Sequence, residues 1–462
     1  MRADAGRNEG AGHRPRRARR VVGVVLLALV VFGVGFASGV FVVRTRAFPY
    51  RQLTSIARRL EGRAGQREVA PGRWRPVRGE LADAELSDEQ LAEVERLMAL
   101  GYVGGSVPAG ADAGVTVHDA ASAFEGLNFV VSGHAPEALL ADMDGRVLHR
   151  WARSFEDVWP GRVLPRGEES QHFWRRAHLY PNGDVLAIFE GLGLIKLDSE
   201  SKLLWVYDGF CHHDLDVLED GTILVLEREP RIVPRFHDEF PVLEDFIAAL
   251  SPEGELVRRV SILKALERSD FEPLLRRVRE PGDIFHTNTL EVLDGTLESS
   301  SPAFARGNVL ISILMLDTVA VVDLDGETVP WALAGRWRQQ HQPTMLPNGR
   351  MLVFDNEAHP GASSSVELDP LSQEVFWRYE GSESALFYTS SCGSNQRLPN
   401  GNTLLTESDN GRAIEVTPDG AIVWEFVSPY RAGDDGEYVA TLFEIVRLDP
   451  GFPLEWMSAD GP

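Results

Sequence analysis

A short hairpin pattern that recurs along the chain is the strongest constraint on its fold. In residues 341–356 a polar residue is followed by an apolar run, the turn Pro347-Asn348-Gly349 and a second apolar run. Asn and Gly adopt the positive φ of such turns at little steric cost. The pattern recurs around four further turn glycines, which are Gly183, Gly221, Gly295 and Gly401. We interpret the five copies as five β-hairpins.

A second turn pattern alternates with the first. In it an apolar residue is followed by a short polar turn and then by a second run that usually ends in Trp or Val. It occurs six times, over residues 141–151, 197–205, 250–257, 322–331, 368–377 and 416–424. One hairpin of each kind makes a four-stranded unit. Such units, repeating every 40 to 75 residues or so along this chain, indicate a β-propeller.

The count of hairpins predicts how the ring closes. Five hairpins of the first kind stand against six of the second, so one blade must be assembled from both ends of the chain. We therefore predict an all-β, six-bladed propeller over residues 113–462, in which residues 440–448 pair with residues 127–132. The regular spacing breaks at about residues 228–285, where a helical pattern follows an acidic, aromatic loop. Because long insertions emerge on a face of the disc, we interpret this one as a lid.

The segment before the propeller has a different character. Residues 1–20 form a basic tail, and residues 21–43 contain no charge. At about 1.5 Å per residue that run spans a bilayer core of roughly 30 Å, which predicts an uncleaved, single-pass signal anchor with the propeller on the extracytoplasmic side. A cleaved signal peptide stays an alternative, because residues 36–39 are mostly small. Residues 44–112 are interpreted as a stalk and linker with one helix at 88–100.

Charge divides the chain in the same place. Residues 1–80 hold 17 arginines and 5 acidic residues, a net charge of +12. Because the whole chain carries −23, the remaining residues carry −35. A propeller of that charge would repel phosphates, which argues against a nucleic-acid partner. The basic segments beside the apolar run suit anionic lipids instead.

The only cysteines, Cys211 and Cys392, fall in different repeats and in no metal-binding spacing. We expect two free, buried thiols, because a disulfide would need Cα atoms within about 7 Å. Their number does not decide the cellular compartment.

Counting back from the turn glycines identifies one equivalent position in each repeat. Eight residues before the glycine stand Arg175, His213, His341 and Gly393, and His286 stands nine before Gly295, a slip that one bulged residue would absorb. Equivalent residues of different blades converge at one mouth of the channel. Histidines there could hold a metal, bind an anion, or perform nucleophilic and acid–base chemistry. The absence of Asp or Glu from these positions weakens the metal hypothesis, whereas His178, His237 and His359 are more simply structural.

Several segments share motifs that go beyond the turns. They are residues 341–356, His212-His213-Asp214-Leu215, His286-Thr287-Asn288-Thr289, residues 395–405 and residues 128–151. Together, across roughly residues 125–430, they resemble the bacterial arylsulfotransferase family. The resemblance implies a six-bladed propeller that moves a sulfuryl group from a phenolic sulfate ester to another phenol. It implies no adenosine-phosphosulfate donor. We expect neither a metal nor a cofactor.

The resemblance also assigns roles to residues. His341 would be the nucleophile that is transiently sulfated, and His213 and His286 would bind the sulfuryl oxygens and protonate the leaving phenolate. Further substrate contacts would come from His212, Asn288 and Asn356. The family pattern places an arginine where this chain has Leu314. We expect Arg175 to supply a replacement cation, since guanidinium binds two sulfuryl oxygens well. The alternative is an arginine paired with a carboxylate at the rim.

Two functional hypotheses follow. The first is a membrane-anchored sulfotransferase-like enzyme that acts on small aromatic sulfates and phenols. The second is a non-catalytic propeller of the same descent, whose histidines are retained for structure or anion binding. A metal-dependent hydrolase is a more distant third, and the sequence gives no indication of an oligomeric state.

Overall fold

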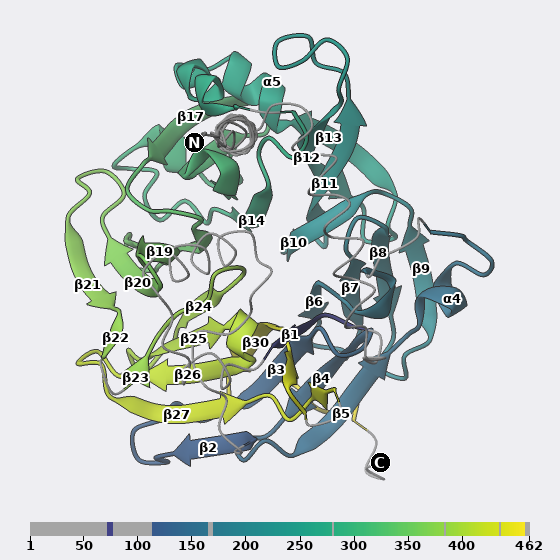
Figure 1. Ribbon diagram of the computed structural model, residues 1–462, viewed down its shortest axis with the longest axis vertical. Coiled ribbons are helices and arrows are strands. Elements are labelled where there is room, and N and C mark those ends of the chain that lie inside the picture. Colours follow the sequence, from purple (N-terminus) through teal and green to yellow (C-terminus); the bar gives the residue numbers. More distant parts are fainter. Residues whose placement is uncertain are drawn as a thin grey trace, which may run out of the picture. The chain divides into compact units, whose positions relative to one another are not determined.

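The computed structural model describes residues 72–76, 113–164, 170–279, 281–382, 385–433 and 436–457. Figure 1 shows six sheets arranged around a central axis, which confirms the predicted all-β, six-bladed propeller. The predicted tail, membrane anchor and stalk helix, in residues 1–71 and 77–112, lie outside the described residues. Within the described ranges, no helix is both long enough and apolar enough to cross a membrane.

Four blades are built from consecutive strands, numbered outward from the channel. The first contains β6 (Arg176–Leu179), β7 (Val185–Phe189), β8 (Gly193–Leu197) and β9 (Leu203–Tyr207). The second contains β10 (Cys211–Val217), β11 (Ile223–Arg231), β12 (Val242–Leu250) and β13 (Leu256–Ser261). The third contains β14 (Thr287–Val292), β15 (Val309–Ile313), β16 (Thr318–Asp323) and β17 (Thr328–Ala334). The fourth contains β18 (His341–Met345), β19 (Met351–His359), β20 (Ala362–Leu368) and β21 (Val375–Tyr379).

The two ends of the chain close the ring together. Strand β30 (Leu442–Leu448) is the innermost strand of a blade completed by β3 (Leu127–Ser132), β4 (Glu137–Ala141) and β5 (Val147–Ala152). Its antiparallel register, with Leu127 opposite Leu448, confirms the predicted pairing. The neighbouring blade contains β24 (Ser394–Arg397), β25 (Thr403–Glu407), β26 (Arg412–Val416) and β27 (Ile422–Val427), and β2 (Gly114–His118) adds a fifth strand outside β27. The pairing of β2 with β27 therefore joins the two ends of the chain a second time, in addition to the pairing of β3 with β30.

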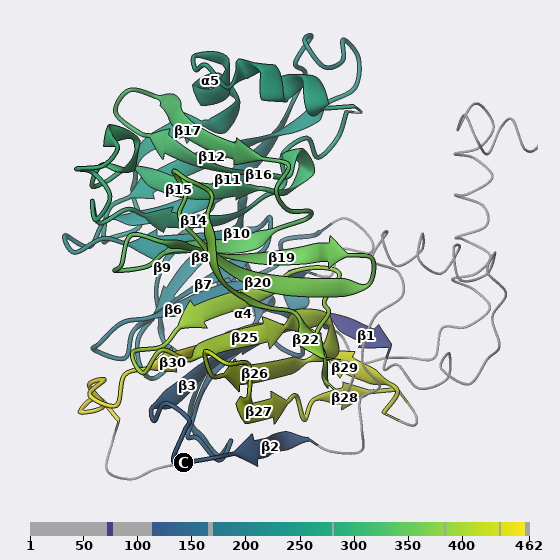
Figure 2. The ribbon, with the colours of Figure 1, turned by 90° about the vertical axis from the view of Figure 1, so that its left-hand side faces the viewer.

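Small elements decorate one face of the disc. A three-stranded sheet of β1 (Trp74–Pro76), β29 (Tyr438–Ala440) and β28 (Arg431–Ala432) lies on the same face as the protruding ends of β19 and β20 (Figure 2). Other short elements are the hairpin β22 (Gly381–Ser382) with β23 (Ala385–Leu386), the helix α4 (Phe155–Val158), and the 3₁₀ helices η1 (Ser170–His172), η4 (Leu314–Leu316) and η5 (Ser408–Asn410).

The predicted lid region differs in detail from the structure. Much of residues 228–285 belongs to the blade itself, in β12 and β13, because these strands follow the same alternation as the others. The additional part is α5 (Ile262–Glu267) and the 3₁₀ helix η2 (Glu272–Arg277). Leu263, Leu266 and Leu275 are buried, so this helical pair packs its apolar stripe into the core of the blade. Only the end of the insertion, at Asp283 and His286, reaches the histidines.

One predicted turn is not tight. Residues 293–308 between β14 and β15 form a loop that contains the 3₁₀ helix η3 (Pro302–Phe304), and Gly295 is one of its positive-φ positions. The sequence shows a local turn at Gly295, but the partner strand follows only after this insertion.

Side chains link the inner strands into a closed belt around the channel. Asp214 on β10 accepts the backbone N–H of Leu290 on β14 at 3.0 Å. In the same way Glu291 on β14 accepts Met345 N–H on β18 at 2.8 Å, and Asn395 on β24 donates to the carbonyl of Gln342 on β18 at 3.1 Å. Two further links complete the belt: Gln396 bonds both backbone groups of Arg447 on β30, and Arg176 on β6 pairs with Glu444 on β30 and with Asp214.

Candidate functional site

A small enclosed cavity lies where the inner strands begin. Four of the five predicted ring positions line it, namely Arg175, His213, His341 and Gly393. The other lining residues are Arg176, Asn288, Thr289, Gln342, Cys392, Ser394 and Phe443. The cavity volume is about 10 Å³, roughly the space of one water molecule. Equivalent repeat positions thus converge on one buried point.

Irregular backbone at the start of the inner strands sets the direction of the histidine side chains. His213 and His286 have φ of 54° and 48°, in the left-handed region that costs a non-glycine residue about 1–3 kcal/mol. The pairing register shifts beside both residues, as it also does just after His341. Such bulges re-aim a side chain away from the regular alternation of a strand.

The tautomer of His341 follows from its hydrogen bonds. Its Nδ1 lies 2.8 Å from Oδ1 of Asn356 and 3.0 Å from the carbonyl of Gln339. The Asn356 amide is oriented by its own Nδ2, which donates to the carbonyls of Thr389 and Cys392. Both neighbours of His341 Nδ1 are therefore acceptors, so Nδ1 carries the proton. The lone pair of the ring is left on Nε2.

Burial keeps this imidazole neutral. Desolvation lowers the pKa of His341 to about 3, and the nearby Arg175 and His286 act in the same direction, against the Asn356 hydrogen bond. A neutral imidazole with a free Nε2 is the nucleophilic form of histidine at any working pH.

His286 is held by a carboxylate. Its Nδ1 lies 2.6 Å from Oδ2 of Asp283, whose Oδ1 accepts the backbone N–H of His286. Burial raises the pKa of Asp283, but the hydrogen bond and charge of His286 outweigh it and the net shift is downward. The His286 ring packs edge-on against His213 with centroids 4.6 Å apart. The carboxylate therefore fixes the orientation of the His286 ring through Nδ1.

His212 and Asn356 lie behind the cavity rather than in its wall. The Nδ1 atoms of His212 and His213 are 3.0 Å apart, so one ring donates to the other. His212 is 1% exposed, and its Nε2 is 3.9 Å from Asp245 Oδ1. The Asn356 amide is fully used by His341 and two backbone carbonyls. The expected substrate contacts from these two residues are therefore replaced by contacts that orient His213 and His341.

Asn288 does line the cavity, but its amide is also engaged. Its Nδ2 donates to the carbonyl of Gln340 at 2.9 Å, and its Oδ1 accepts the hydroxyl of Thr289. This side chain anchors the loop before His341 to the neighbouring blade.

Arg175 brings a buried positive charge to the same cavity. It is 5% exposed, and its guanidinium carbon lies 4.9 Å from the centre of the Phe443 ring. Within the described part of the chain no carboxylate lies within ion-pair distance of it, and its Nε has no hydrogen-bond partner. Its charge helps to lower the pKa of both His213 and His341. The alternative of an arginine paired with a rim carboxylate does not describe this residue.

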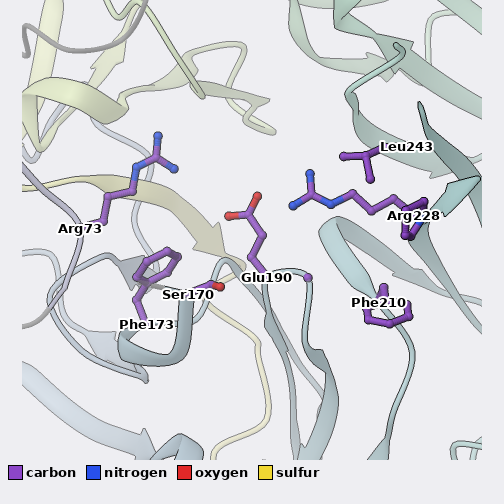
Figure 3. A pocket seen from close by; sticks show the side chains of 9 residues that line it. Arg73, Ser170, Phe173, Glu190, Phe210, Arg228 and Leu243 are labelled. Carbon is purple, nitrogen blue, oxygen red and sulfur yellow. The ribbon is translucent and has the colours of Figure 1, made fainter. Parts of the chain in front are cut away.

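Figure 3 shows a larger pocket that is lined by residues from several blades. Its volume is about 410 Å³, and its lining includes Phe173, Glu190, Phe210, Arg228 and Arg73. Glu190 Oε1 lies 3.7 Å from His213 Nδ1, and Arg228 Nη1 lies 4.0 Å from Asp283 Oδ2. The pocket is large enough for a small aromatic molecule.

Comparison with known proteins decides the family. Residues 176–429, more than half of the chain, match the family described as Arylsulfotransferase (ASST). The chain belongs to the arylsulfotransferase family. The matched region runs from β6 to the residues after β27, so it includes all three histidines and their supporting residues. None of the curated protein sequences compared with this arylsulfotransferase-family chain matches it.

Several solved structures resemble this family member at low sequence identity. A protein of unknown function from Bacteroides caccae is 14% identical, covering 70% of this chain and 98% of its own, with a TM-score of 0.46. The WD40 propeller domain of Doa1 is 13% identical, covering 73% and 93%, with a TM-score of 0.41. A streptogramin B lyase is 11% identical, covering 74% and 93%, with a TM-score of 0.40. Nothing about function follows from likenesses of this size.

Leu314, where the sequence analysis expected an arginine, lies beside His286. Leu314 begins η4, and its backbone N–H donates to the carbonyl of His286 at 3.4 Å. The half-buried side chain of Leu314 carries no charge. Arg175, which lines the cavity, is the candidate for the cation that the sequence analysis expected.

Sequence reasoning missed three residues that contact the histidines or adjoin them, namely Glu190, Arg228 and Asp283. Asp283 stands three residues before His286, a spacing compatible with a side-chain contact across one turn, and this signal could have identified it. Glu190 directly follows β7, and Arg228 lies within β11. The repeat pattern gives no reason to distinguish either of them from other polar residues.

Proposed function

We propose that this protein transfers a sulfuryl group from an aryl sulfate ester to a phenol through a sulfated His341. The observation that carries the proposal is the tautomer of His341, whose Nδ1–H faces two acceptors and whose Nε2 is free. Membership of the arylsulfotransferase family and the shared cavity with Arg175 and His213 support the same reaction.

In the first step the Nε2 lone pair of His341 attacks the sulfur of the donor ester. A nitrogen–sulfur bond forms, the ester oxygen–sulfur bond breaks, and the sulfated ring becomes positively charged. The acceptors at Nδ1 stabilise that charge. Protonated His286, paired with Asp283, donates its proton to the departing phenolate, and the Arg175 guanidinium offsets negative charge on the sulfuryl oxygens.

The second step reverses the first with a different phenol. The acceptor hydroxyl gives its proton to neutral His286 and its oxygen attacks the sulfur. The nitrogen–sulfur bond breaks and His341 returns to the neutral form. Over both steps the donor ester becomes a phenol and the acceptor phenol becomes a sulfate ester. The protein returns to its starting state.

A second function, anion binding without transfer, would need less space beside His341 than transfer does. The cavity beside His341 holds about 10 Å³, whereas a sulfuryl group with its aryl ring requires far more space. Transfer therefore requires side chains at the mouth to move or the ester to be held in the adjoining pocket.

The two functions are distinguished by incubating the full-length protein with 4-nitrophenyl sulfate and a phenol acceptor. We expect release of 4-nitrophenolate that depends on the acceptor, and a peptide containing sulfated His341 when the acceptor is omitted. His341→Ala should abolish both signals. The matched control is His359→Ala, because His359 is exposed at the end of β19 and does not line the cavity. A wild-type protein that binds the ester without turnover would support the second function.

We also propose that residues 21–43 anchor the chain in a membrane with the propeller on the extracytoplasmic side. The length of the uncharged run and the arginines before it support this topology. Extraction of the intact protein from membranes by high salt, or a mature amino terminus near residue 40, would contradict it.

A further inference from the structure

A segment far ahead of the propeller in sequence contributes to the pocket beside the histidines. The N-terminal strap (residues 72–76) ends in β1, which pairs with β29 so that Trp74 lies opposite Ala440. The strap is also tied to the blade that closes the ring, because Arg73 N–H donates to the carbonyl of Gly133, just after β3, at 2.6 Å. On its other side the backbone N–H of Thr441 donates to the carbonyl of Arg73 at 3.1 Å. The strap is thus bonded to both sides of the seam where the ring closes.

Two glycines allow the backbones to approach this closely. A Cβ added at Gly133 would lie 2.9 Å from Arg73 Cβ and 3.0 Å from Arg73 O. A Cβ added at Gly72 would lie 2.7 Å from Gly133 O. Contacts under 3.0 Å force one of the segments to shift, so the docked position of the strap depends on the missing side chains.

The strap delivers the Arg73 side chain to the pocket, opposite Arg228 and with Glu190 between them (Figure 3). The Arg73 guanidinium carbon is 5.6 Å from the centre of the buried Phe443 ring. The Arg175 guanidinium also lies over this ring. Phe173 of the pocket packs on Phe443 with centroids 5.2 Å apart. Pocket and histidine cavity therefore share a wall.

The pocket lining combines aromatic rings with guanidinium groups. Phe173 and Phe210 provide apolar faces for a ring, and the described lining residues carry two positive charges and one negative. Glu190 is directed to the His213 side, at 3.7 Å from its Nδ1. Guanidinium groups bind carboxylates with two parallel hydrogen bonds.

We propose that this pocket selects aryl substrates that carry a second anionic group, a carboxylate on the ring, and that Arg73 of the strap is a specificity-determining residue for that group. The inference rests on the proposed function for the orientation of the substrate, with the reacting oxygen toward His341 and the carboxylate toward Arg73 and Arg228. Arg73 reaches the substrate only while the strap is docked, so the strap and the propeller form one site.

The test compares paired ligands in turnover and in binding. We expect 4-sulfooxybenzoate to exceed phenyl sulfate in kcat/KM by about tenfold or more, the factor typical of one charge-assisted contact. By calorimetry, 4-hydroxybenzoate should bind the full-length protein more tightly than phenol by a similar factor. Arg73→Gln should remove both preferences while activity on phenyl sulfate persists. The matched control is Arg258→Gln, because Arg258 on the outer strand β13 pairs with exposed Asp325.

A second variant tests the strap without changing any charge. Gly133 does not have positive φ, so Gly133→Ala adds no backbone strain and acts through its clash with Arg73. It should reproduce the loss caused by Arg73→Gln at unchanged melting temperature of the propeller. Equal treatment of the paired ligands by the wild type, or a preference that survives in Arg73→Gln, would overturn the inference. A binding preference that depends on Arg73 in a protein without turnover would uphold it and reject the proposed transfer.

Discussion

The carboxylate of Asp283 and the imidazole of His286 form a pair in which Oδ2 lies 2.6 Å from Nδ1. The same carboxylate accepts the backbone N–H of His286 through its other oxygen, at 2.9 Å. Both contacts form within one turn at the end of the insertion that follows β13. A carboxylate fixed in this way holds the ring in one orientation, as in other pairs of carboxylate and histidine that act as acids and bases.

Asp283→Asn tests this pair. The neutral amide keeps a hydrogen-bonding group but removes the negative charge beside the His286 ring. We expect kcat to fall by about 10²-fold or more. Steady-state kinetics of both proteins measure the effect. A normal kcat in the variant would assign Asp283 a structural role only.

Asn356→Ala tests the tautomer of His341. Without the Asn356 oxygen, the imidazole can rotate or move its proton to Nε2, and the nucleophilic lone pair is lost for part of the time. One hydrogen bond contributes about 0.5–1.5 kcal/mol, so the transfer rate should fall by roughly tenfold. Asn308→Ala is a suitable control because its amide donates to the loop carbonyl of Ala303. Equal rates in both variants would show that Asn356 does not hold the tautomer.

Arg175→Met separates function from stability. A buried cation without a carboxylate partner is costly to keep, so replacing it with an apolar side chain should leave the melting temperature unchanged or raise it. The same change should lower kcat strongly, because no fixed charge then faces the sulfuryl oxygens. Leu314→Arg in that background should recover part of the rate. A large loss of melting temperature with little loss of rate would indicate a structural arginine.

Three buried imidazoles should make the protein sensitive to acid. Burial lowers the pKa of His341 to about 3, and it lowers the pKa values of His212 and His213 well below the ordinary value. Because the folded values lie below the unfolded value of about 6.5, the unfolded chain binds more protons in between. The free energy of unfolding should therefore decrease as the pH falls below about 6.5.

His341→Gln removes one of these titrating groups. Its free energy of unfolding should fall less steeply with decreasing pH, by up to about 1.4 kcal/mol per pH unit. Urea denaturation of both proteins between about pH 7 and pH 5 measures the slopes. Parallel slopes would mean that His341 is protonated equally in the folded and unfolded chains.

The architecture could be predicted from the sequence because turn chemistry and strand alternation are local properties. A turn glycine and the residue eight before it lie in one hairpin, so their spacing carries over to every blade that keeps the hairpin. This placed Arg175, His213 and His341 at equivalent positions and required the ends of the chain to share a blade. The sequence also specified the apolar stripe of residues 261–279, although the helices there pack into a blade.

Contacts between distant segments were decided by the tertiary structure alone. The tautomer of His341 depends on the carbonyls of Thr389 and Cys392, which orient the amide of Asn356 from another blade. Arg73 enters the pocket because two glycines let the strap cross the residues around Gly133, and nothing in either segment predicts the other. Local patterns specify which residues face the axis of a propeller. Only closure of the ring brings side chains from separate blades within 3 Å, where hydrogen bonds and charge determine what they can do.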